Sequence, residues 1–469
     1  MAAFERSIGN TWDSSIVPTL CRYIEIPNKS PMFDADWDAH GHMRAAIKLL
    51  ETWSRSVPIA GVQLEIVALP GRTPVLFAEI AATRADAPTV LLYGHYDKQP
   101  EFTGWNEGLG PWTPVIKDGR LYGRGGADDG YATFASLTAI AALQERQIGH
   151  GRLVVLIEGC EESGSFDLPF YLEHLGPRIG APDLVVCLDA EAGDYDRLWL
   201  SSSLRGLLIG TLEVSVLTEG VHSGAASGIV PSSFRILRSL LDRIEDVASG
   251  KMIDALHVPI DAQTRANARS LVETLGDVIV DRYPWAAGVV PMAQESVELV
   301  LNNTWRPTLS VTGLSGAPPV TSAGNTLRPS TSATLSIRLP PTLDAQAAAR
   351  TVKTILEANP PYGAHVRFTT DGGQPGWAAP KLDATLAVAF DGASRAYFGK
   401  PVCYMGMGGT IPFLKMLGDR FPKAQFMVTG VLGPHSNAHG PNEFLDIETA
   451  KRVTCCVAHV LAASAGTAP

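Results

Sequence analysis

The chain has 469 residues, of which 45% are hydrophobic and 18% are charged, and its formal net charge at pH 7 is −10. This length and composition are typical of a globular protein with two domains and a sizeable core. The acidic net charge excludes a non-specific nucleic-acid binder, because such a protein needs a basic surface.

The N-terminal segment MAAFERSIGNTWDSS has acidic and polar residues where a signal peptide would carry its apolar stretch. The longest apolar segment, YATFASLTAIAALQ, is too short to cross a bilayer and is typical of a buried helix. We therefore expect no association with a membrane.

Six cysteines occur without paired spacing, at Cys21, Cys160, Cys187, Cys403, Cys455 and Cys456. In a chain of this size, this distribution indicates reduced thiols in the core rather than a disulfide framework. We therefore expect a cytoplasmic protein.

The first 200 residues alternate short apolar runs with helical patterns. Runs typical of strands occur at 64–70, 74–80, 89–97, 153–162 and 183–191, and helical patterns occur at 34–57 and 130–147. This alternation predicts an α/β domain with a largely parallel sheet covered on both faces. In such sheets, functional groups gather at the carboxyl ends of the strands.

The pattern changes near residue 205. Apolar and polar residues alternate at 207–220, as in an antiparallel strand with one exposed face, and an amphipathic helix is predicted at 233–247. A strand, a helix and a further strand are predicted at 333–340, 344–359 and 364–370. The overall order, strand-helix-strand-strand-helix-strand, predicts a small α+β sandwich.

The Gly- and Pro-rich segment 371–381 predicts a linker out of this sandwich. The first pattern then returns, with helices predicted at 383–399 and 446–464 and a strand at 425–430. We therefore predict one α/β domain, built from residues 1–205 and 376–469, that is interrupted by an inserted α+β domain at 206–375.

Acidic and histidine side chains follow several of the predicted strands. They are His95 and Asp97, Glu161 and Glu162, and Asp189 and Glu191, with Asp128 and Asp129 in a glycine-rich loop and His435 and His439 near the C-terminus. In a parallel sheet these groups converge on one rim, where their negative charges would repel each other without a cation among them. Mixed histidine and carboxylate ligands suit Zn²⁺, with Mn²⁺ or Co²⁺ as alternatives.

Each of these clusters alone has a structural interpretation. A single histidine at a strand end is usually only hydrogen-bonded, two aspartates in a glycine-rich loop often form a turn or a helix cap, and adjacent glutamates are usually a solvated pair. Their joint occurrence favours a site for one or two divalent cations.

Several motifs occur in the order found in the M20 metallopeptidases, the family of carnosinases, aminoacylases and acetylornithine deacetylases. They are GHYDKQP, LYGRGGADDG, EGCEESGS, CLDAE, VHSG, GGTIP and HGPNE. The resemblance covers the chain from about residue 15 to its end, and SSSLRG followed by VHSG is most similar to the dipeptidase branch that includes cytosolic carnosine dipeptidase. It implies two zinc or manganese ions in the α/β domain, an inserted lid domain that often dimerises, and cleavage of a terminal amide.

The resemblance also implies the metal ligands. By its position in the motifs, Asp128 resembles the carboxylate that bridges both metals. His95 and Asp189 resemble the other ligands of one metal, and Glu162 and His439 resemble those of the other.

His435 is an alternative to His439 as the C-terminal ligand. Asn442 and Glu443 follow His439 at the family spacing, which favours His439.

Two further acidic residues resemble groups that assist the metals. Asp97 lies two residues from His95 and on the same strand face, so it resembles the partner that orients the imidazole. Glu161 resembles the general base, which accepts a proton from the attacking water and delivers it to the departing amine.

Five residues of the later motifs resemble substrate-contacting groups, although each has a structural interpretation too. His222 resembles a residue that reaches an active site across a dimer and stabilises the developing oxyanion. Arg338 resembles a residue that binds the substrate carboxylate, a task suited to the guanidinium group. Asn325, Gly409 and Thr410 resemble weaker contacts, and Thr410 stands where serine is common.

The chain departs from the family motifs around the expected bridging carboxylate. The usual Asp-Asp-Lys-Gly is replaced by Asp128-Asp129-Gly130-Tyr131, so the lysine is absent. The residue after His-x-Asp, usually apolar, is Lys98. These changes leave open how the loop that carries Asp128 packs.

We therefore expect a dinuclear metal-dependent hydrolase that cleaves the amide bond of dipeptides or similar small substrates, as a homodimer formed through the inserted domain. The alternative is an N-acyl-amino-acid amidohydrolase with the same metal centre. A non-catalytic binding relative is disfavoured, because every expected ligand and the base are present.

Overall fold

The structure is a computed structural model that describes residues 4–468. The chain forms two compact units. The first comprises Met1–Ser202, Ala379–Met405 and Met416–Pro469, and the second comprises Ser203–Ala378 and Gly406–Lys415. The ends of the longer segment of the second unit lie close to the predicted boundaries at 206 and 375, but the short segment 406–415, predicted within the α/β domain, groups with the second unit.

The first unit is built around a six-stranded sheet with the strand order β1-β2-β6-β3-β7-β18. The strands are β1 (Val62–Val67), β2 (Val75–Ile80), β6 (Leu153–Glu158), β3 (Val90–His95), β7 (Leu184–Cys187) and β18 (Gln425–Val428). The last four run parallel to one another, whereas β2 pairs antiparallel with β6, and the edge strand β1 pairs antiparallel with β2. The predicted fold class, α/β with a mostly parallel sheet and an inserted α+β domain, is confirmed.

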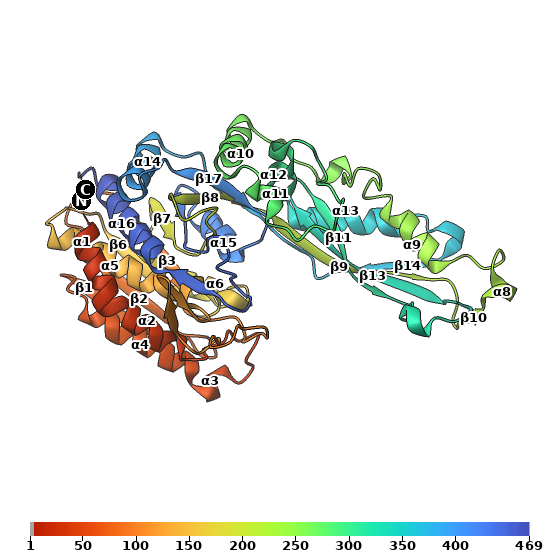
Figure 1. Cartoon of the computed structure of the whole chain (residues 1–469), viewed down its shortest axis with the longest axis horizontal. Coiled ribbons are helices and arrows are strands. Elements are labelled where there is room, and N and C mark those ends of the chain that lie inside the picture. The colour runs from red at the N-terminus through yellow and green to blue at the C-terminus, as the bar shows by residue number, and fades with distance from the viewer. Residues whose placement is uncertain (1–3, 469) are drawn as a thin grey trace. The chain divides into compact units, whose positions relative to one another are not determined.

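Helices of the first unit lie around this sheet (Figure 1). They are α1 (Glu5–Thr11), the π-helix η1 (Trp12–Ile16), α2 (Val17–Ile24), α3 (Trp37–His40), α4 (His42–Ser56), α5 (Tyr131–Glu145), α6 (Leu168–His174), α7 (Gly176–Ile179), α14 (Ala384–Phe398) and α16 (Ile447–Ser464). In α4, buried Met43, Ile47 and Leu50 recur at helical spacing, so one face of this helix joins the core.

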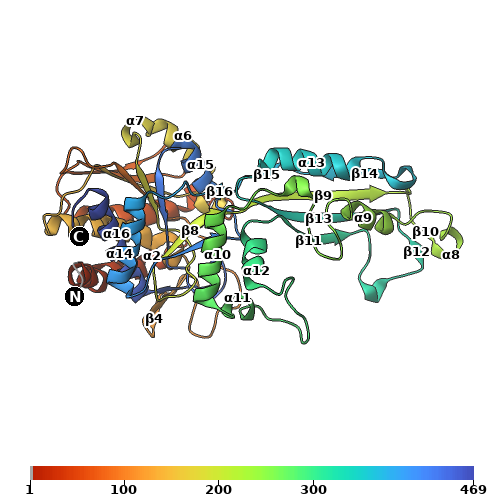
Figure 2. The same cartoon turned by 90° about the horizontal axis from the view of Figure 1, so that it is seen from above.

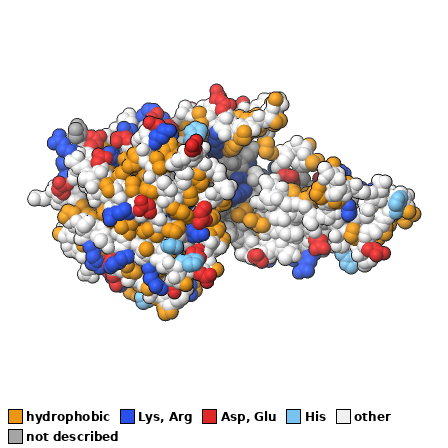
Figure 3. All heavy atoms as spheres, turned by 60° about the horizontal axis from the view of Figure 1, so that its bottom comes forward, with side chains coloured by type: hydrophobic (Ala, Val, Ile, Leu, Met, Phe, Trp, Pro, Cys, Tyr) orange, Lys and Arg blue, Asp and Glu red, His pale blue; other side chains and the backbone are white. Residues whose placement is uncertain are grey.

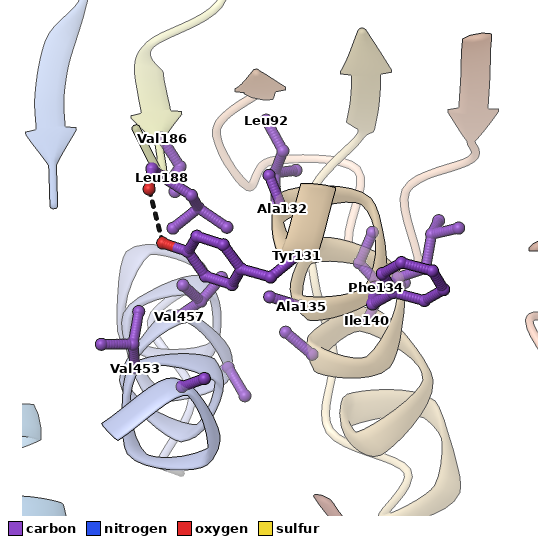
Figure 4. Packing of buried hydrophobic residues seen from close by; sticks show 14 of the residues in the cluster. Leu92, Tyr131, Ala132, Phe134, Ala135, Ile140, Val186, Leu188, Val453 and Val457 are labelled. Carbon is purple, nitrogen blue, oxygen red and sulfur yellow. Dashed lines mark hydrogen bonds between the residues drawn. The ribbon is translucent and has the colours of Figure 1, made fainter. Parts of the chain in front are cut away.

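Helix α5 is buried on nearly all sides, because it lies between the sheet and other helices. Figure 4 shows Tyr131 and Ala135 of α5 beside Val453 and Val457 of α16. The Tyr131 hydroxyl donates a hydrogen bond to the backbone oxygen of Leu188, just after β7. The start of α5, which follows the aspartate loop, is thereby attached to the end of a central strand.

A small antiparallel sheet joins two loops that are distant in sequence. Its strands are β4 (Val115–Lys117), β5 (Arg120–Tyr122) and β19 (Phe444–Asp446), in the order β19-β5-β4. Phe444 pairs with Tyr122, so the segment that precedes β19 lies beside the segment that follows β5. The first of these segments contains His439 and the second contains Asp128.

The second unit contains an antiparallel sheet with the order β11-β13-β9-β14. Its main elements are β9 (Gly206–Ser215), α9 (Ser233–Leu241), β11 (Thr308–Ser315), β13 (Ser330–Leu339), α13 (Ala345–Glu357) and β14 (His365–Thr369), in the predicted strand-helix-strand-strand-helix-strand order. Apolar residues of one sheet face, such as Leu212 and Leu335, pack with apolar residues of α9 and α13, such as Leu240 and Val352. Figure 1 and Figure 2 show these two helices beside the sheet.

Several elements of the second unit were not predicted. Three helices separate α9 from β11: α10 (Ala262–Leu275), α11 (Val278–Asp281) and α12 (Ser296–Thr304). A small two-stranded antiparallel sheet pairs β10 (Val221–His222) with β12 (Thr326–Leu327), and the short helix α8 (Ser223–Ala226) follows β10 directly.

The predicted linker 371–381 includes the short strands β15 (Gly373–Gln374) and β16 (Trp377–Ala378). Strand β15 pairs with β9, and a Cβ atom at Gly373 would lie 2.5 Å from the backbone oxygen of Ala345. The glycine therefore permits a close backbone approach, which the linker interpretation did not anticipate.

The chain passes from one unit to the other within β8 (Trp199–Leu204), after β16, within β17 (Cys403–Met407) and within α15 (Pro412–Arg420). Among residues 4–468, no helix has the length and apolar character required to cross a membrane. On the face of the first unit drawn in Figure 3, acidic, basic and hydrophobic side chains are interspersed.

Candidate metal centre

The predicted acidic and histidine residues of the first unit converge at the carboxyl ends of β3, β6 and β7. His95 is the last residue of β3 and pairs with Glu158, the last residue of β6. The turn that contains Glu161 and Glu162 follows β6 closely, and Asp189 lies two residues beyond the end of β7. Because these strands are parallel neighbours, their ends meet at one edge of the sheet.

Two groups of three side chains share Asp128. One group is His95, Asp128 and Asp189, the other is Asp128, Glu162 and His439, and the ligand atoms within each group lie within 4.8 Å of one another. In the first group, His95 Nε2 lies 3.4 Å from Asp128 Oδ1 and 3.8 Å from Asp189 Oδ2. In the second, His439 Nε2 lies 3.0 Å from Asp128 Oδ2 and 3.3 Å from Glu162 Oε2. Each carboxylate oxygen of Asp128 therefore faces one histidine.

Two atoms of this cluster are buried without a hydrogen-bond partner among the described residues, His95 Nε2 and Glu162 Oε1. Leaving such atoms unpaired costs free energy, which a cation bound among them would offset. The donor set of imidazole nitrogens and carboxylate oxygens is one that zinc and related divalent ions accept. The residues present therefore fit two cations that share Asp128.

The electrostatics of the cluster agree with this fit. Burial raises the pKa of Glu161 and of Glu162 well above the usual value, and neighbouring carboxylates raise both further. Burial also raises the pKa of Asp189, to about 6. Burial acts against the ionised form of Asp128 as well, but the adjacent imidazoles of His439 and His95 outweigh it and lower the pKa of Asp128. Without a cation, the carboxylates of this edge thus resist full ionisation.

The loop that carries Asp128 is fastened to the loop that carries His439. Arg124 and Glu443, both buried, form an ion pair of 2.5 Å, and Arg124 also donates to the backbone oxygen of Gly440 at 2.7 Å. The second oxygen of Glu443 accepts a hydrogen bond of 2.8 Å from the backbone of Gly125. These bonds set the distance between the two loops.

Asp97 contacts both His95 and the glutamate turn. Its Oδ1 lies 3.4 Å from His95 Nδ1, as expected for a group that orients the imidazole. Its two oxygens also accept hydrogen bonds from the backbone nitrogens of Glu161 at 3.1 Å and Glu162 at 2.9 Å. One buried carboxylate therefore holds the histidine and the turn together.

The adjacent glutamates have different surroundings. Glu162 is buried, and its Oε2 accepts a hydrogen bond of 2.6 Å from Gln99 in addition to its proximity to His439. Glu161 is only partly buried. The sequence interpretation missed Gln99, although it belongs to the GHYDKQP motif, because its contact with Glu162 exists only in the folded chain.

Of the two C-terminal histidines, the structure brings His439 into the cluster. His435 is exposed, and among residues 4–468 it belongs to neither ligand group.

The five predicted substrate-contacting residues belong to the second unit, where they form two groups. His222 is exposed and pairs with Thr326, and the backbone of the next residue, Ser223, donates to the oxygen of Asn325 at 2.9 Å. His222 and Asn325 are therefore neighbours.

Arg338 lies near the end of β13, far from that pair. Its Nη1 donates to Thr410 Oγ1 at 3.3 Å, and the Thr410 hydroxyl donates to the backbone oxygen of Arg205 at 2.5 Å. Gly409 precedes Thr410, and a Cβ atom there would meet nothing within 4 Å. Arg338, Gly409 and Thr410 thus form the second group.

The chain is similar to known proteins over most of its length. A model of peptidase family M20/M25/M40 matches residues 91–463. The Cysteinylglycine-S-conjugate dipeptidase of Corynebacterium striatum is 29% identical over 392 residues, 80% of this chain and 81% of that protein. The Beta-Ala-His dipeptidase of Homo sapiens is 27% identical over 396 residues, 81% of this chain and 76% of that protein. The solved structure of the dipeptidase Dug1p from Saccharomyces cerevisiae has the same fold, with a TM-score of 0.74, 22% identity and 100% coverage of both chains.

Proposed function

Because this chain belongs to peptidase family M20/M25/M40 and is a metal-dependent hydrolase, we propose that it is a dipeptidase with a dinuclear metal centre in its first unit. The observation that carries the proposal is the pair of ligand groups that share Asp128, with a buried His95 Nε2 that has no hydrogen-bond partner in the described chain. His95 and Asp189 would hold one ion, Glu162 and His439 the other, and Asp128 both. Zn²⁺ suits these ligands best, with Mn²⁺ or Co²⁺ as alternatives.

The side chains at the carboxyl ends of β3, β6 and β7 would have different roles in hydrolysis. When bound, the cations would supply the positive charge that acidifies a water molecule and polarises the scissile carbonyl. Glu161 would accept the proton of the attacking water and deliver it to the departing amine. Asp97 would fix both the His95 imidazole and the backbone of Glu161, because its carboxylate contacts both. Glu162 is engaged by Gln99 and His439, which supports assigning the proton transfer to its neighbour.

Arg338 would bind the carboxylate of the substrate. It is half-buried, its hydrogen bond in the structure is to a neutral hydroxyl, and within residues 4–468 no acidic side chain forms an ion pair with it. A partly desolvated guanidinium without a carboxylate partner suits recognition of a free C-terminus. Gly409 and Thr410 would add polar contacts to the same substrate, whereas Asn325, a neighbour of His222, would contact the substrate that His222 serves.

The distance between His222 and Arg338 supports a homodimer. Arg338 is eight residues along β13 from Ser330, about 26 Å at 3.3 Å per residue, and His222 lies beyond the Ser330 end of that strand. One small substrate cannot contact both residues of the same chain. His222 would therefore serve the active site of a second copy, where it would stabilise the oxyanion. The edge strand β11 offers a pairing surface for such a copy.

The substrate class is proposed to be dipeptides, which the names of both curated relatives support. An N-acyl-amino-acid amidohydrolase with the same centre is the alternative. We also propose a cytoplasmic location, which is supported by the six cysteines, all free and five of them buried.

The test is hydrolysis of a panel of dipeptides and N-acyl amino acids by the native enzyme, the chelated enzyme and the enzyme reloaded with Zn²⁺ or Mn²⁺. We expect metal-dependent cleavage of dipeptides, with about two ions bound per chain. Preferential cleavage of N-acyl amino acids would favour the amidohydrolase, and bound metal without turnover on any substrate would favour a binding protein. The absence of bound metal would overturn the assignment of the ligands.

A further inference from the structure

Lys98, three residues after His95, is completely buried. Its Nζ donates to the backbone oxygens of Tyr23 and Ile26, each at 2.8 Å, and lies 3.5 Å from that of Ile24. Helix α2 ends at Ile24, and the amine adds a second hydrogen bond to carbonyl groups of this helix end, since the Tyr23 oxygen also accepts from Ile26 N at 3.1 Å and the Ile26 oxygen from Asn28 N at 3.0 Å. Burial lowers the pKa of Lys98, and the carbonyl groups replace the hydrogen bonds that water would make with the amine.

The aliphatic part of Lys98 packs against Gly125. A Cβ atom on Gly125 would lie 2.6 Å from Lys98 Cγ and 2.7 Å from Cε. Gly125 has a φ of +78° and begins the turn Gly126–Gly130, which contains Asp128. The aliphatic part of Lys98 therefore packs against the residue that precedes the turn carrying the proposed bridging ligand.

Gly130, at the other end of this turn, faces the same two residues as Lys98. A Cβ atom on Gly130 would lie 2.3 Å from Tyr23 Cε1 and 2.5 Å from the backbone oxygen of Gly125. The Tyr23 ring in turn lies 4.0 Å from Lys98 Nζ. The φ of Gly130 is −53°, so its backbone would accept a side chain, and what excludes one is space.

We propose that Lys98 is the positioning residue of the Asp128 turn and that it takes over the place of the lysine that the family motif has at position 130. From the end of β3, its stem supports Gly125 and its amine attaches the end of α2, which together confine the turn. In this chain Lys98 approaches the Tyr23 ring from the end of β3, and the absence of a side chain at Gly130 leaves space for that ring. The inference rests on the proposed role of Asp128 as a metal ligand.

The first experiment compares Lys98→Met with the native chain in metal affinity, measured by competition with a chromophoric chelator for Zn²⁺ at a temperature where both are folded. We expect the affinity of Lys98→Met to be about 10- to 100-fold weaker, as for other residues that orient ligands. The matched control is Lys29→Met, because Lys29 lies on the segment facing Lys98 but pairs with the partly exposed Glu101 at 3.0 Å. An unchanged affinity in Lys98→Met, with only a lower melting temperature, would overturn the proposal and leave Lys98 as a helix cap.

The second experiment moves the lysine from position 98 to position 130. Gly130→Lys alone should weaken Zn²⁺ binding, because the new side chain collides with Tyr23. In the double variant Lys98→Val, Gly130→Lys, removal of the Lys98 stem gives Tyr23 room to move, so we expect tighter binding than the separately measured single variants Lys98→Val and Gly130→Lys predict by addition. Additive losses would overturn the proposal.

The two experiments separate this inference from the proposed function. If the native chain binds no Zn²⁺, the metal centre itself has been misassigned. If the native chain binds Zn²⁺ and neither the substitution nor the exchange changes the affinity as expected, the metal centre stands and the role of Lys98 is wrong. If Lys98→Met fails to fold, the double variant is compared with Gly130→Lys, and equal affinities would overturn the proposal.

Discussion

The two units of this chain hold their predicted functional residues in different ways. In the first unit, residues from five separate segments lie within hydrogen-bond or ligand distance of one another, and buried bonds such as Arg124–Glu443 fasten the loops that carry them. In the second unit, His222 is exposed and Arg338 lies at the other end of a ten-residue strand. The candidate metal ligands thus come together within one unit, whereas the predicted substrate contacts are spread along the sheet of the other.

The largest expected effect concerns the first unit. Replacing Glu161 by Gln keeps the size of the side chain but removes its ability to accept a proton. We expect kcat to fall by about 10²- to 10⁴-fold while the metal content, measured by elemental analysis, stays at the native level.

Glu162→Gln is the matched control, because it changes the adjacent carboxylate in the same way. We expect this variant to bind metal more weakly, since Glu162 belongs to a ligand group. If Glu161→Gln lost the metal and Glu162→Gln kept it, the two roles would have to be exchanged.

The second effect tests whether the second unit acts across a dimer. His222→Ala should lower kcat by about 10²- to 10³-fold, as the loss of one oxyanion contact does elsewhere. Refolding an equimolar mixture of His222→Ala and Glu161→Gln should restore about a quarter of native activity. Half of the dimers then contain one chain of each variant, and one of the two sites in each mixed dimer is complete.

The control for this experiment is His365→Ala, since His365 is also exposed, on β14 of the same unit. We expect His365→Ala to keep native activity. A monomer that is fully active in solution would contradict both the dimer and the role of His222.

A smaller effect concerns recognition of the substrate carboxylate. For dipeptides with a free C-terminus, we expect kcat/KM of Arg338→Met to fall by about 10- to 100-fold, in line with the loss of a hydrogen bond to a charged group. For the same dipeptides with an amidated C-terminus, the substitution should have little effect, because the carboxylate is already absent.

Arg367→Met provides the comparison, because Arg367 is an exposed arginine on β14 of the same sheet. Equal losses on free and amidated substrates would show that Arg338 supports the fold of the second unit rather than the substrate.

The smallest effect is on stability and returns to the first unit. Glu158 is buried beneath the glutamate turn, where it accepts hydrogen bonds from Tyr93 and Ser165. Burial raises the pKa of Glu158 to about 8, from an ordinary value of 4.5. The folded chain therefore holds this proton more tightly than the unfolded chain, so the contribution of Glu158 to stability is full below pH 4.5 and is lost as the pH rises towards 8.

Glu158→Gln cannot ionise. In urea unfolding with a chelator present, we expect its free energy of unfolding to fall less than that of the native chain between about pH 5 and 8. Glu107→Gln, at an exposed position, should keep the native pH dependence. If the free energy of unfolding fell equally with pH for Glu158→Gln and for the native chain, Glu158 would be ionised in the folded protein.

Much of the architecture could be predicted because it depends on local patterns. Apolar runs of strand length, helical spacing such as that of α4, and the alternation along β9 reflect which face of each element is buried. The antiparallel edge formed by β1 and β2 could not be predicted in this way, since a buried strand has the same composition in either direction. The helices α10 and α12 were missed because their apolar spacing is weak beside that of α9 and α13.

For the candidate site, too, local patterns predicted some features and not others. The sequence by itself predicted the candidate metal ligands His95, Asp128, Glu162, Asp189 and His439, because the strand ends and motifs that contain them make them recognisable. Only the tertiary structure showed how closely His439 approaches Asp128, that Asp97 holds the glutamate turn, and that the Lys98 stem packs against Gly125. The physical reason is that these contacts join residues far apart in the chain, so their distances are set by strand register and loop packing, which no local pattern encodes.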